Sequence, residues 1–193
     1  MSSHTDTTPN RLVVGISGAS GIIYGLRMLD MLRTLGVETH LVMSDSAALT
    51  LRHETDFSLD EVTARADYHY PPEALDAAIA SGSFRTRGMV VAPCSMRSLS
   101  AIAHGLTATL LTRAADVTLK ERRPLVLMTR ETPLHLGHLR NMVLVTEMGA
   151  IVAPPVPAFY ARPADLDAMV THTAARVLDL LGFASDGIRR WGE

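Results

Sequence analysis

The chain has 193 residues, which suits one domain that buries about 70 % of the surface of its unfolded form. Its net charge of −2 and its charged fraction of 20% argue against a nucleic-acid partner, which requires a broad basic excess. The single cysteine, Cys94, excludes an internal disulfide framework and a zinc cluster built from cysteines. We find no N-terminal apolar stretch of the length of a signal or membrane segment, so we expect a cytoplasmic protein with no membrane contact that acts on a small molecule.

Alternating strand and helix patterns begin after a polar tail at residues 1–10, which we expect to be disordered. Short, continuous apolar runs at 12–16, 39–43, 89–92, 125–129 and 150–152 predict strands buried on both faces of a parallel sheet. Helical patterns occupy 22–35, 46–52, 95–104, 107–122, 135–148 and, after an extended proline-rich segment, 165–181. The segment 56–70 is ambiguous and has room for one short extra strand. We therefore predict one α/β domain over residues 11–193, with a doubly wound, mostly parallel, Rossmann-like sheet.

A glycine-rich loop, Gly15-Ile-Ser-Gly-Ala-Ser-Gly21, joins the first predicted strand to the first predicted helix. Such a loop presents backbone N–H groups and the positive end of a helix to an anion, which favours a phosphate site. The glycines are three residues apart and the second strand ends at Ser44, so the dinucleotide fingerprint with its acidic ribose partner is absent. The loop predicts a mononucleotide site; a tight turn that requires small residues is the alternative.

The third predicted strand ends in a turn that contains Cys94, Ser95 and Ser98. Both serines are placed to cap the following helix, and they are also placed to bind a ligand phosphate at its start. The sequence alone leaves both roles open. For Cys94 we expect a buried, inert thiol, because no neighbour in the sequence would activate it as a nucleophile.

Cationic side chains recur in the second half of the chain. Arg113 and Lys120 are seven residues apart and so point within about 20° of each other on their helix, with Asp116 near the same stripe. A solvated face with salt bridges would show the same pattern. Arg130 and Glu131 follow the fourth predicted strand, at an end of the sheet where ligands bind. Together with Tyr160 and Arg176, the cations Arg113, Lys120 and Arg130 form a set that would neutralise a phosphate or diphosphate. Glu131 would move a proton; the alternative is that it pairs with an arginine and orders its loop.

Two further patterns carry little chemistry. His135 and His138 share a helix face, but no third ligand follows in the sequence, so we expect ordinary helix histidines and no metal. The chain has no G-x-S-x-G nucleophile elbow, which argues against a hydrolase of that kind.

Seven separated motifs, in the same order, carry a resemblance to a known family. They are Gly15-Ile-Ser-Gly-Ala-Ser-Gly-Ile-Ile-Tyr-Gly25, Ala80-Ser-Gly-Ser83, Ala92-Pro-Cys-Ser-Met96, Arg113-Ala-Ala-Asp-Val-Thr-Leu-Lys-Glu-Arg-Arg123, Arg130-Glu-Thr-Pro133, Phe159-Tyr160 and Arg190-Trp-Gly192. Over residues 12–193 the chain resembles the UbiX-type flavin prenyltransferases, within the wider flavoprotein family that includes the cysteine-peptide decarboxylases. The resemblance implies a flavodoxin-type sheet and a homododecamer with FMN held between subunits.

The resemblance also implies a reaction and a set of site residues. A dimethylallyl group from dimethylallyl phosphate would be joined to reduced FMN, first at N5 and then at C6, to make the prenylated flavin of UbiD-type decarboxylases. The implied FMN contacts are Gly18, Ala19, Ser20, Ser44, Ser95, Met96, Arg97, Ser98 and Arg130. The implied contacts of the prenyl phosphate are Ser81, Gly82, Arg113, Lys120, Tyr160 and Arg176. The implied proton-handling residues are Ser20, Glu54 and Glu131, and no metal is required because the cations would stabilise the departing phosphate.

The chain departs from this family at two places. Thr107-Ala-Thr109 stands where many relatives carry Ala-Asp-Asn, and Glu73-Ala-Leu-Asp-Ala77 stands where many carry a tryptophan. The rival functions are an FMN-dependent decarboxylase, of a cysteine-type substrate or of an aromatic acid, and a non-catalytic FMN-binding subunit. Arg130-Glu-Thr-Pro133 replaces the Pro-x-Met-Asn clamp of the cysteine-type enzymes, which argues against that rival.

Overall fold

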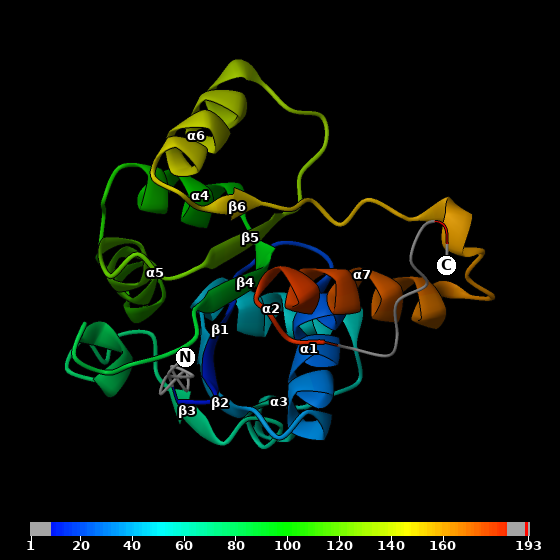
Figure 1. Cartoon of the computed structure of the whole chain (residues 1–193), viewed down its shortest axis with the longest axis horizontal. Coiled ribbons are helices and arrows are strands. Elements are labelled where there is room, and N and C mark those ends of the chain that lie inside the picture. Colours follow the sequence, from blue (N-terminus) through cyan, green and yellow to red (C-terminus); the bar gives the residue numbers. More distant parts are fainter. Residues whose placement is uncertain (1–8, 185–191, 193) are drawn as a thin grey trace, which may run out of the picture.

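The computed structural model describes residues 9–184 and Gly192 of the chain. Within them, six strands pair in parallel in the order β3-β2-β1-β4-β5-β6 (Figure 1). The strands are β1 (Arg11–Ile16), β2 (Glu38–Met43), β3 (Tyr68–Tyr70), β4 (Met89–Cys94), β5 (Leu125–Thr129) and β6 (Ile151–Val152). This order confirms the predicted doubly wound sheet and places its switch point between β1 and β4.

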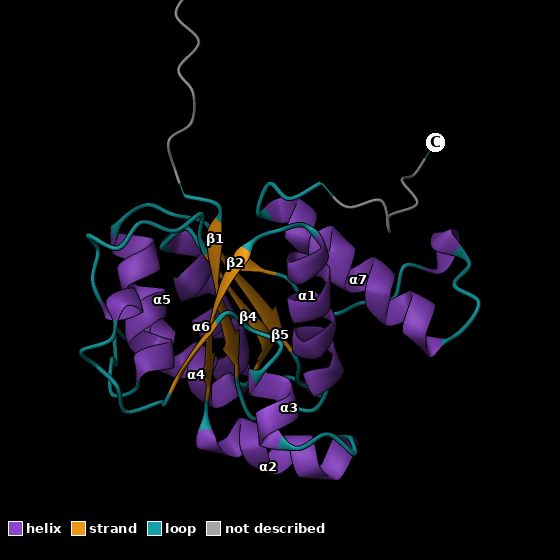
Figure 2. Ribbon diagram, turned by 90° about the horizontal axis from the view of Figure 1, so that it is seen from below, coloured by secondary structure: helices purple, strands orange, loops and turns teal. Residues whose placement is uncertain are grey.

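Helices cover both faces of the sheet (Figure 2). The helices are α1 (Ile22–Thr34), α2 (Asp45–Glu54), α3 (Leu59–Thr63), α4 (Met96–Ala103), α5 (Leu110–Lys120), α6 (Leu136–Glu147) and α7 (Leu166–Leu180), with short 3-10 turns η1 (Ala78–Ala80) and η2 (Phe159–Ala161). Residues of α1, α2, α3 and α7 pack in the hydrophobic cluster of one face, and residues of α4, α5 and α6 pack in the cluster of the other.

Alternate residues of each strand supply these two clusters. In β1, Leu12 and Val14 belong to the cluster with α1 and α7, whereas Val13 belongs to the cluster with α5. Successive side chains of a strand point to opposite faces, so a strand covered on both faces must be apolar throughout. Every residue of β4 and β5 is buried for this reason. Gly25 lets α1 pack closely on the sheet, since a Cβ there would clash with the carbonyl oxygen of Ala92.

Three predicted elements need correction or completion. The helix predicted over 107–122 is observed as α5 and begins only after Thr109, whose backbone is extended and whose side chain accepts a hydrogen bond from the N–H of Thr112. The ambiguous segment 56–70 contains both α3 and the edge strand β3. Of the tail predicted over 1–10, only Pro9 and Asn10 lie among the described residues, and Asn10 Nδ2 donates to Gly36 O at 3.0 Å. No helix in the described ranges is long and apolar enough to cross a membrane.

Candidate active site

A cavity of about 540 Å³ lies at the carboxyl ends of the strands, beside the switch point. It is lined by the turns after β1, β2 and β4, by α4 and α5, and by the loop between these two helices. Five of the predicted FMN residues line this cavity: Gly18, Ser44, Ser95, Arg97 and Ser98. Leu106, Ala108 and Leu111 supply apolar surface to the same cavity. The cavity thus combines the polar groups and the apolar surface that a flavin mononucleotide requires.

Ser17 joins two of the turns that line the cavity. Its side chain is buried; the hydroxyl donates to Pro93 O at 2.9 Å and accepts from Ser95 N at 2.7 Å. The turn after β1 is therefore held in a fixed position relative to the turn after β4. The sequence interpretation assigned no role to Ser17; a polar residue directly behind a fully apolar strand was the available signal.

Ser95 begins α4 as its N-cap. Its Oγ accepts from Ser98 N at 3.2 Å and donates to Ser98 Oγ at 3.1 Å, so the capping role predicted for both serines is confirmed for Ser95, and Ser98 is the residue whose N–H is capped. Both serines also line the cavity, and a contact with a ligand phosphate stays a prediction.

Cys94 is fully buried, and desolvation raises the pKa of its thiol to about 12, which confirms the expectation of an inert thiol.

The helix end behind the glycine-rich loop is occupied by a carboxylate of the same chain. Gly21, the N-cap of α1, has no side chain to offer, and Glu54 at the end of α2 takes that place. Its carboxylate accepts from Gly21 N at 2.9 and 3.1 Å and from Ile22 N at 3.0 Å. The N–H groups of Gly21 and Ile22 therefore already have an anion, whereas the FMN contacts predicted at Gly18, Ala19 and Ser20 stay predictions.

Glu54 forms a small charged group with Ser20 and Arg130. The pKa of Glu54 lies below its usual value. Partial burial acts to raise this pKa, but the hydrogen bonds from Ser20, Gly21 and Ile22 and the positive charge of Arg130 lower it by more. Arg130 follows β5, and its N–H donates to Cys94 O at 3.2 Å. Two of the three predicted proton-handling residues, Ser20 and Glu54, are thus in contact, beside a predicted FMN contact.

Glu131, the third predicted proton-handling residue, lies in the exposed loop after β5. Its carboxylate accepts from Thr132 N at 3.0 Å, a contact that orders this loop locally. No ion pair joins Glu131 to an arginine within residues 9–184. Ala19 and Met96 lie next to the cavity-lining residues in the sequence without lining the cavity themselves.

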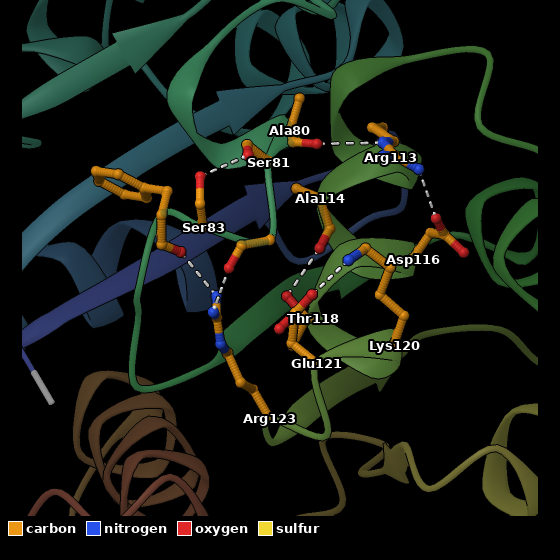
Figure 3. A network of polar contacts seen from close by, with 12 residues as sticks. Ala80, Ser81, Ser83, Arg113, Ala114, Asp116, Thr118, Lys120, Glu121 and Arg123 are labelled. Carbon is orange, nitrogen blue, oxygen red and sulfur yellow. Dashed lines mark hydrogen bonds and ion pairs between the residues drawn. The ribbon is translucent and has the colours of Figure 1, made fainter.

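Four of the predicted prenyl-phosphate residues lie along the contact between α5 and the loop after η1, with Arg113 near the start of α5 and Lys120 at its end (Figure 3). Arg113 donates from Nε to Ala80 O at 3.2 Å and from Nη1 to Asp116 at 2.8 Å. Lys120 pairs with Glu121, and Ser81 Oγ bonds with Ser83 Oγ at 2.9 Å. A Cβ on Gly82 would lie 2.6 Å from Lys120 Nζ, so the loop passes directly over the ammonium group.

Arg123 fixes this loop, and the sequence interpretation gave it no role. Its two guanidinium nitrogens donate to Gly82 O and Phe84 O, each at 2.8 Å. The guanidinium of Arg11, at the start of β1, stacks over the Phe84 ring at 4.6 Å. The loop with Ser81 and Gly82 therefore lies at the amino edge of the sheet, whereas the cavity lies at the carboxyl edge.

The remaining two prenyl-phosphate residues lie on the other face of the sheet. Tyr160 is in η2, with its ring edge-on to His172 of α7 at 5.9 Å, and Arg176 of α7 donates to Asp179 at 3.1 Å. Because α7 packs with α1 and α5 packs on the opposite face, a single chain does not bring the two groups together.

The two histidines at the start of α6 stack on each other. Their ring centroids are 3.6 Å apart, and His135 Nδ1 accepts from Gly137 N at 3.0 Å, which makes His135 the N-cap. Within the part of the chain that the structure describes, no group of three or more histidine, cysteine or acidic residues is arranged to hold a metal ion.

Known proteins match this chain over nearly its whole length. The model of the family described as Flavoprotein matches residues 1–178. The chain belongs to the flavoprotein family. The "Flavin prenyltransferase UbiX" of Escherichia coli (strain K12) is 58% identical over 184 residues, which cover 94% of this chain and 97% of that protein.

Two solved structures extend the comparison to the fold. The crystal structure of AnUbiX (PadA1), in complex with FMN and dimethylallyl pyrophosphate, superposes with a TM-score of 0.94 at 46% identity and covers 96% of this chain and 98% of that one. The dodecameric "FMN-dependent Ubix-like Decarboxylase" of Escherichia coli O157:H7 has a TM-score of 0.92 at 48% identity, with 95% of this chain and 100% of that chain covered. The family resemblance proposed from the seven motifs is thereby confirmed.

Proposed function

We propose that the protein is a flavin prenyltransferase that joins a dimethylallyl group from dimethylallyl phosphate to reduced FMN. The observation that carries this proposal is the cavity at the switch point, which combines five predicted FMN residues with apolar surface, in a chain 58% identical to a flavin prenyltransferase. Reduced FMN supplies the nucleophilic N5 and C6 atoms when bound. The residues of this chain bind it, orient it, hold protons and stabilise the departing phosphate.

The flavin phosphate is proposed to bind to the serines that line the cavity, Ser44, Ser95 and Ser98. The N–H groups of α1 are occupied by Glu54, whereas the hydroxyls of Ser44, Ser95 and Ser98 line the cavity. Each of Ser44 and Ser95 starts a helix, so the positive ends of α2 and α4 also point toward these serines. The apolar residues that line the same cavity offer the surface on which an aromatic ring packs.

The prenyl-phosphate site is proposed to form between copies of the chain. Lys120 lies at the other end of α5 from two residues that line the cavity, about 16 Å from Thr109 and about 12 Å from Thr112 along the helix. A second copy that brings its amino edge to this cavity would place Ser81, Gly82, Arg113 and Lys120 beside the flavin, and Tyr160 and Arg176 would come from another surface. Exposed apolar side chains on α6 and around η2, including Leu136, Val143 and Phe159, are available for such contacts.

A homododecamer is proposed on the likeness to the dodecameric relative. The UbiD-type decarboxylase as recipient of the product, the monophosphate as donor and the cytoplasm as location remain predictions from the sequence.

Proton handling is assigned to Ser20, Glu54 and Glu131. The hydrogen bond between Ser20 and Glu54 gives a proton path from a hydroxyl to a carboxylate that is already ionised. Glu131 lies in the loop after Arg130, at the same edge of the sheet. Its proposed task is to take the proton that leaves C6 when the new ring closes.

The decisive experiment is incubation of the purified protein with reduced FMN and dimethylallyl phosphate, followed by mass spectrometry of the flavin. We expect a flavin heavier by one dimethylallyl unit, and a Lys120→Met variant that retains FMN but loses turnover by about 10² or more. Unmodified flavin would contradict the proposal. Loss of carbon dioxide from a carboxylic acid in the same preparation would favour a decarboxylase, for which the name of the dodecameric relative is the motive. FMN binding without either reaction would leave a flavin-binding subunit.

A further inference from the structure

A carboxylate lies inside the group of residues that the proposed function assigns to the donor phosphate. The side chains of Lys120 and Glu121 form an ion pair directly against the backbone of Gly82, where even a methyl group would clash with both side-chain ends (Figure 3). An anion-binding site normally excludes a carboxylate, because like charges repel across a few ångströms. The position of Glu121 against Gly82 and Lys120 therefore needs an explanation.

Helix stability does not supply that explanation. Glu121 is the C-cap residue of α5, and the negative end of the helix dipole disfavours an acidic residue at this position. The exposed Lys120–Glu121 pair adds little to folding, since surface ion pairs contribute about 0–1 kcal/mol. The carboxylate is nevertheless ionised near neutral pH, because the hydrogen bond and the charge of Lys120 hold the pKa of Glu121 below its usual value.

Two positive charges and one negative charge lie around the loop that contains Ser81 and Gly82. Lys120 and Arg123 each bring a positive charge, Arg123 is engaged by the carbonyls of Gly82 and Phe84, and Glu121 removes one charge from the same spot. Arg113 is likewise paired with Asp116, one turn earlier on α5. A ligand with two negative charges meets less repulsion from Glu121 than a ligand with three. The penalty that Glu121 imposes thus grows with the charge of the ligand.

We propose that Glu121 is a specificity-determining residue that favours a monophosphate donor over a diphosphate donor. The inference rests on the proposed function, in that the loop with Ser81 and Gly82 is taken as the phosphate site. A monophosphate ester carries up to two negative charges near neutral pH, and a diphosphate ester carries about one more. Removal of the Glu121 charge should strengthen the binding of both, and of the diphosphate more.

The test measures binding, without turnover. Inorganic phosphate and pyrophosphate are titrated by calorimetry into the assembled, FMN-loaded protein as wild type, Glu121→Gln and Asp30→Asn. Glu121→Gln keeps the size of the side chain and its acceptor for Lys120. Asp30→Asn also removes one carboxylate charge, from a 2.7 Å ion pair with Arg65 that lies on the opposite face of the sheet. We expect the affinity ratio of pyrophosphate to phosphate to rise roughly tenfold in Glu121→Gln and to stay unchanged in Asp30→Asn.

Two further variants separate the possible failures. Glu121→Asp retains the charge, and its ratio should stay near that of the wild type, which distinguishes charge from shape. Lys120→Met should weaken both anions. An unchanged or lower ratio in Glu121→Gln, with Lys120→Met still weakening both anions, would overturn the inference and leave the proposed site intact. No effect of Lys120→Met would place the phosphate elsewhere and would overturn the proposed site together with the inference. The same ratio measured as kcat/KM with the two dimethylallyl donors should move in the same direction.

Discussion

Two helices, α1 and α4, follow the neighbouring strands β1 and β4 at the carboxyl edge of the sheet, and their N-termini are stabilised in different ways. The first turn of α1 has a glycine as its N-cap and receives its anion, Glu54, from 33 residues further along the chain. The first turn of α4 is capped by its own Ser95, whose hydroxyl also faces the cavity. A glycine-rich turn is therefore free to bind a phosphate only if the chain does not fill it first. Here Glu54 fills the N–H groups at the start of α1, while Gly18 of the same turn and Ser95 of the serine turn both line the cavity.

The largest expected effect comes from closing the space beside the glycine-rich turn. In Gly18→Ala the added Cβ would clash with the side chain of Ser46 and approach its backbone carbon to 2.9 Å, so the start of α2 must move. We expect FMN affinity to fall by about 10² or more, because Gly18, Ser44 and Ser46 all line the cavity. Titration of FMN by flavin fluorescence measures this.

Gly15→Ala is the matched control for that prediction. The three atoms nearest to its added Cβ would all be side-chain atoms, at 3.1 Å or more, and the nearest is the flexible end of Met89. FMN affinity should stay within a few-fold of the wild type. Equal loss of affinity in the two variants would mean that the loop responds to any added bulk.

Removal of the internal anion should have the next largest effect. Glu54→Ala leaves the N–H groups of Gly21 and Ile22 without their acceptor, and we expect a loss of about 1–2 kcal/mol in the free energy of unfolding. Thermal melts should show a Tm lower by roughly 2–8 °C. Glu54→Gln keeps an acceptor and should recover part of the Tm, while turnover stays about 10² or more below the wild type if the carboxylate handles a proton. An unchanged Tm in Glu54→Ala would show that the cap is unimportant.

The bridge between the two turns should give a smaller effect. Ser17→Ala removes the acceptor of Ser95 N and the donor to Pro93 O, in a buried position. We expect FMN affinity to fall about tenfold, since one lost hydrogen bond with a buried orphan costs about 1–3 kcal/mol. The control is Thr118→Ala, which removes a buried hydroxyl bond of 2.7 Å to Ala114 within α5. If both variants lower the Tm but only Ser17→Ala weakens FMN binding, Ser17 positions the site.

The sequence predicts local elements well because their signals are local. Continuous apolar runs identified β1, β2, β4 and β5 within one or two residues, and the N-cap role of Ser95 followed from its place before a helix. The prediction for α5 began three residues too early because Thr109 competes for the backbone as a cap. Contacts between distant segments have no such signal.

The site could be predicted in part for the same reason. The cavity collected Gly18, Ser44, Ser95 and Ser98, because the carboxyl ends of parallel strands meet at one edge. The sequence alone could not reveal that Glu54 caps α1 or that Ser17 bridges two turns. It also could not reveal that Lys120 and Arg176 lie on opposite faces of the sheet. The periodicity of a helix gives the direction of a side chain on that helix, and it says nothing of which face of the sheet the helix covers.

The smallest expected effect is the pH dependence of the internal anion. The folded-state pKa of Glu54 is depressed below its ordinary value of 4.5, so folding favours its charged form. The stabilisation is therefore fully present above pH of about 4.5 and is lost as the pH falls through the folded-state pKa. We expect the Tm difference between wild type and Glu54→Gln to be constant from pH of about 6 to 8 and to shrink below pH of about 4.5. No such change is expected for Ser95→Ala, because a hydroxyl cap does not titrate in this range. A Tm difference that widens in acid would mean that folding favours the protonated form of Glu54, which would contradict its role as the internal anion at the start of α1.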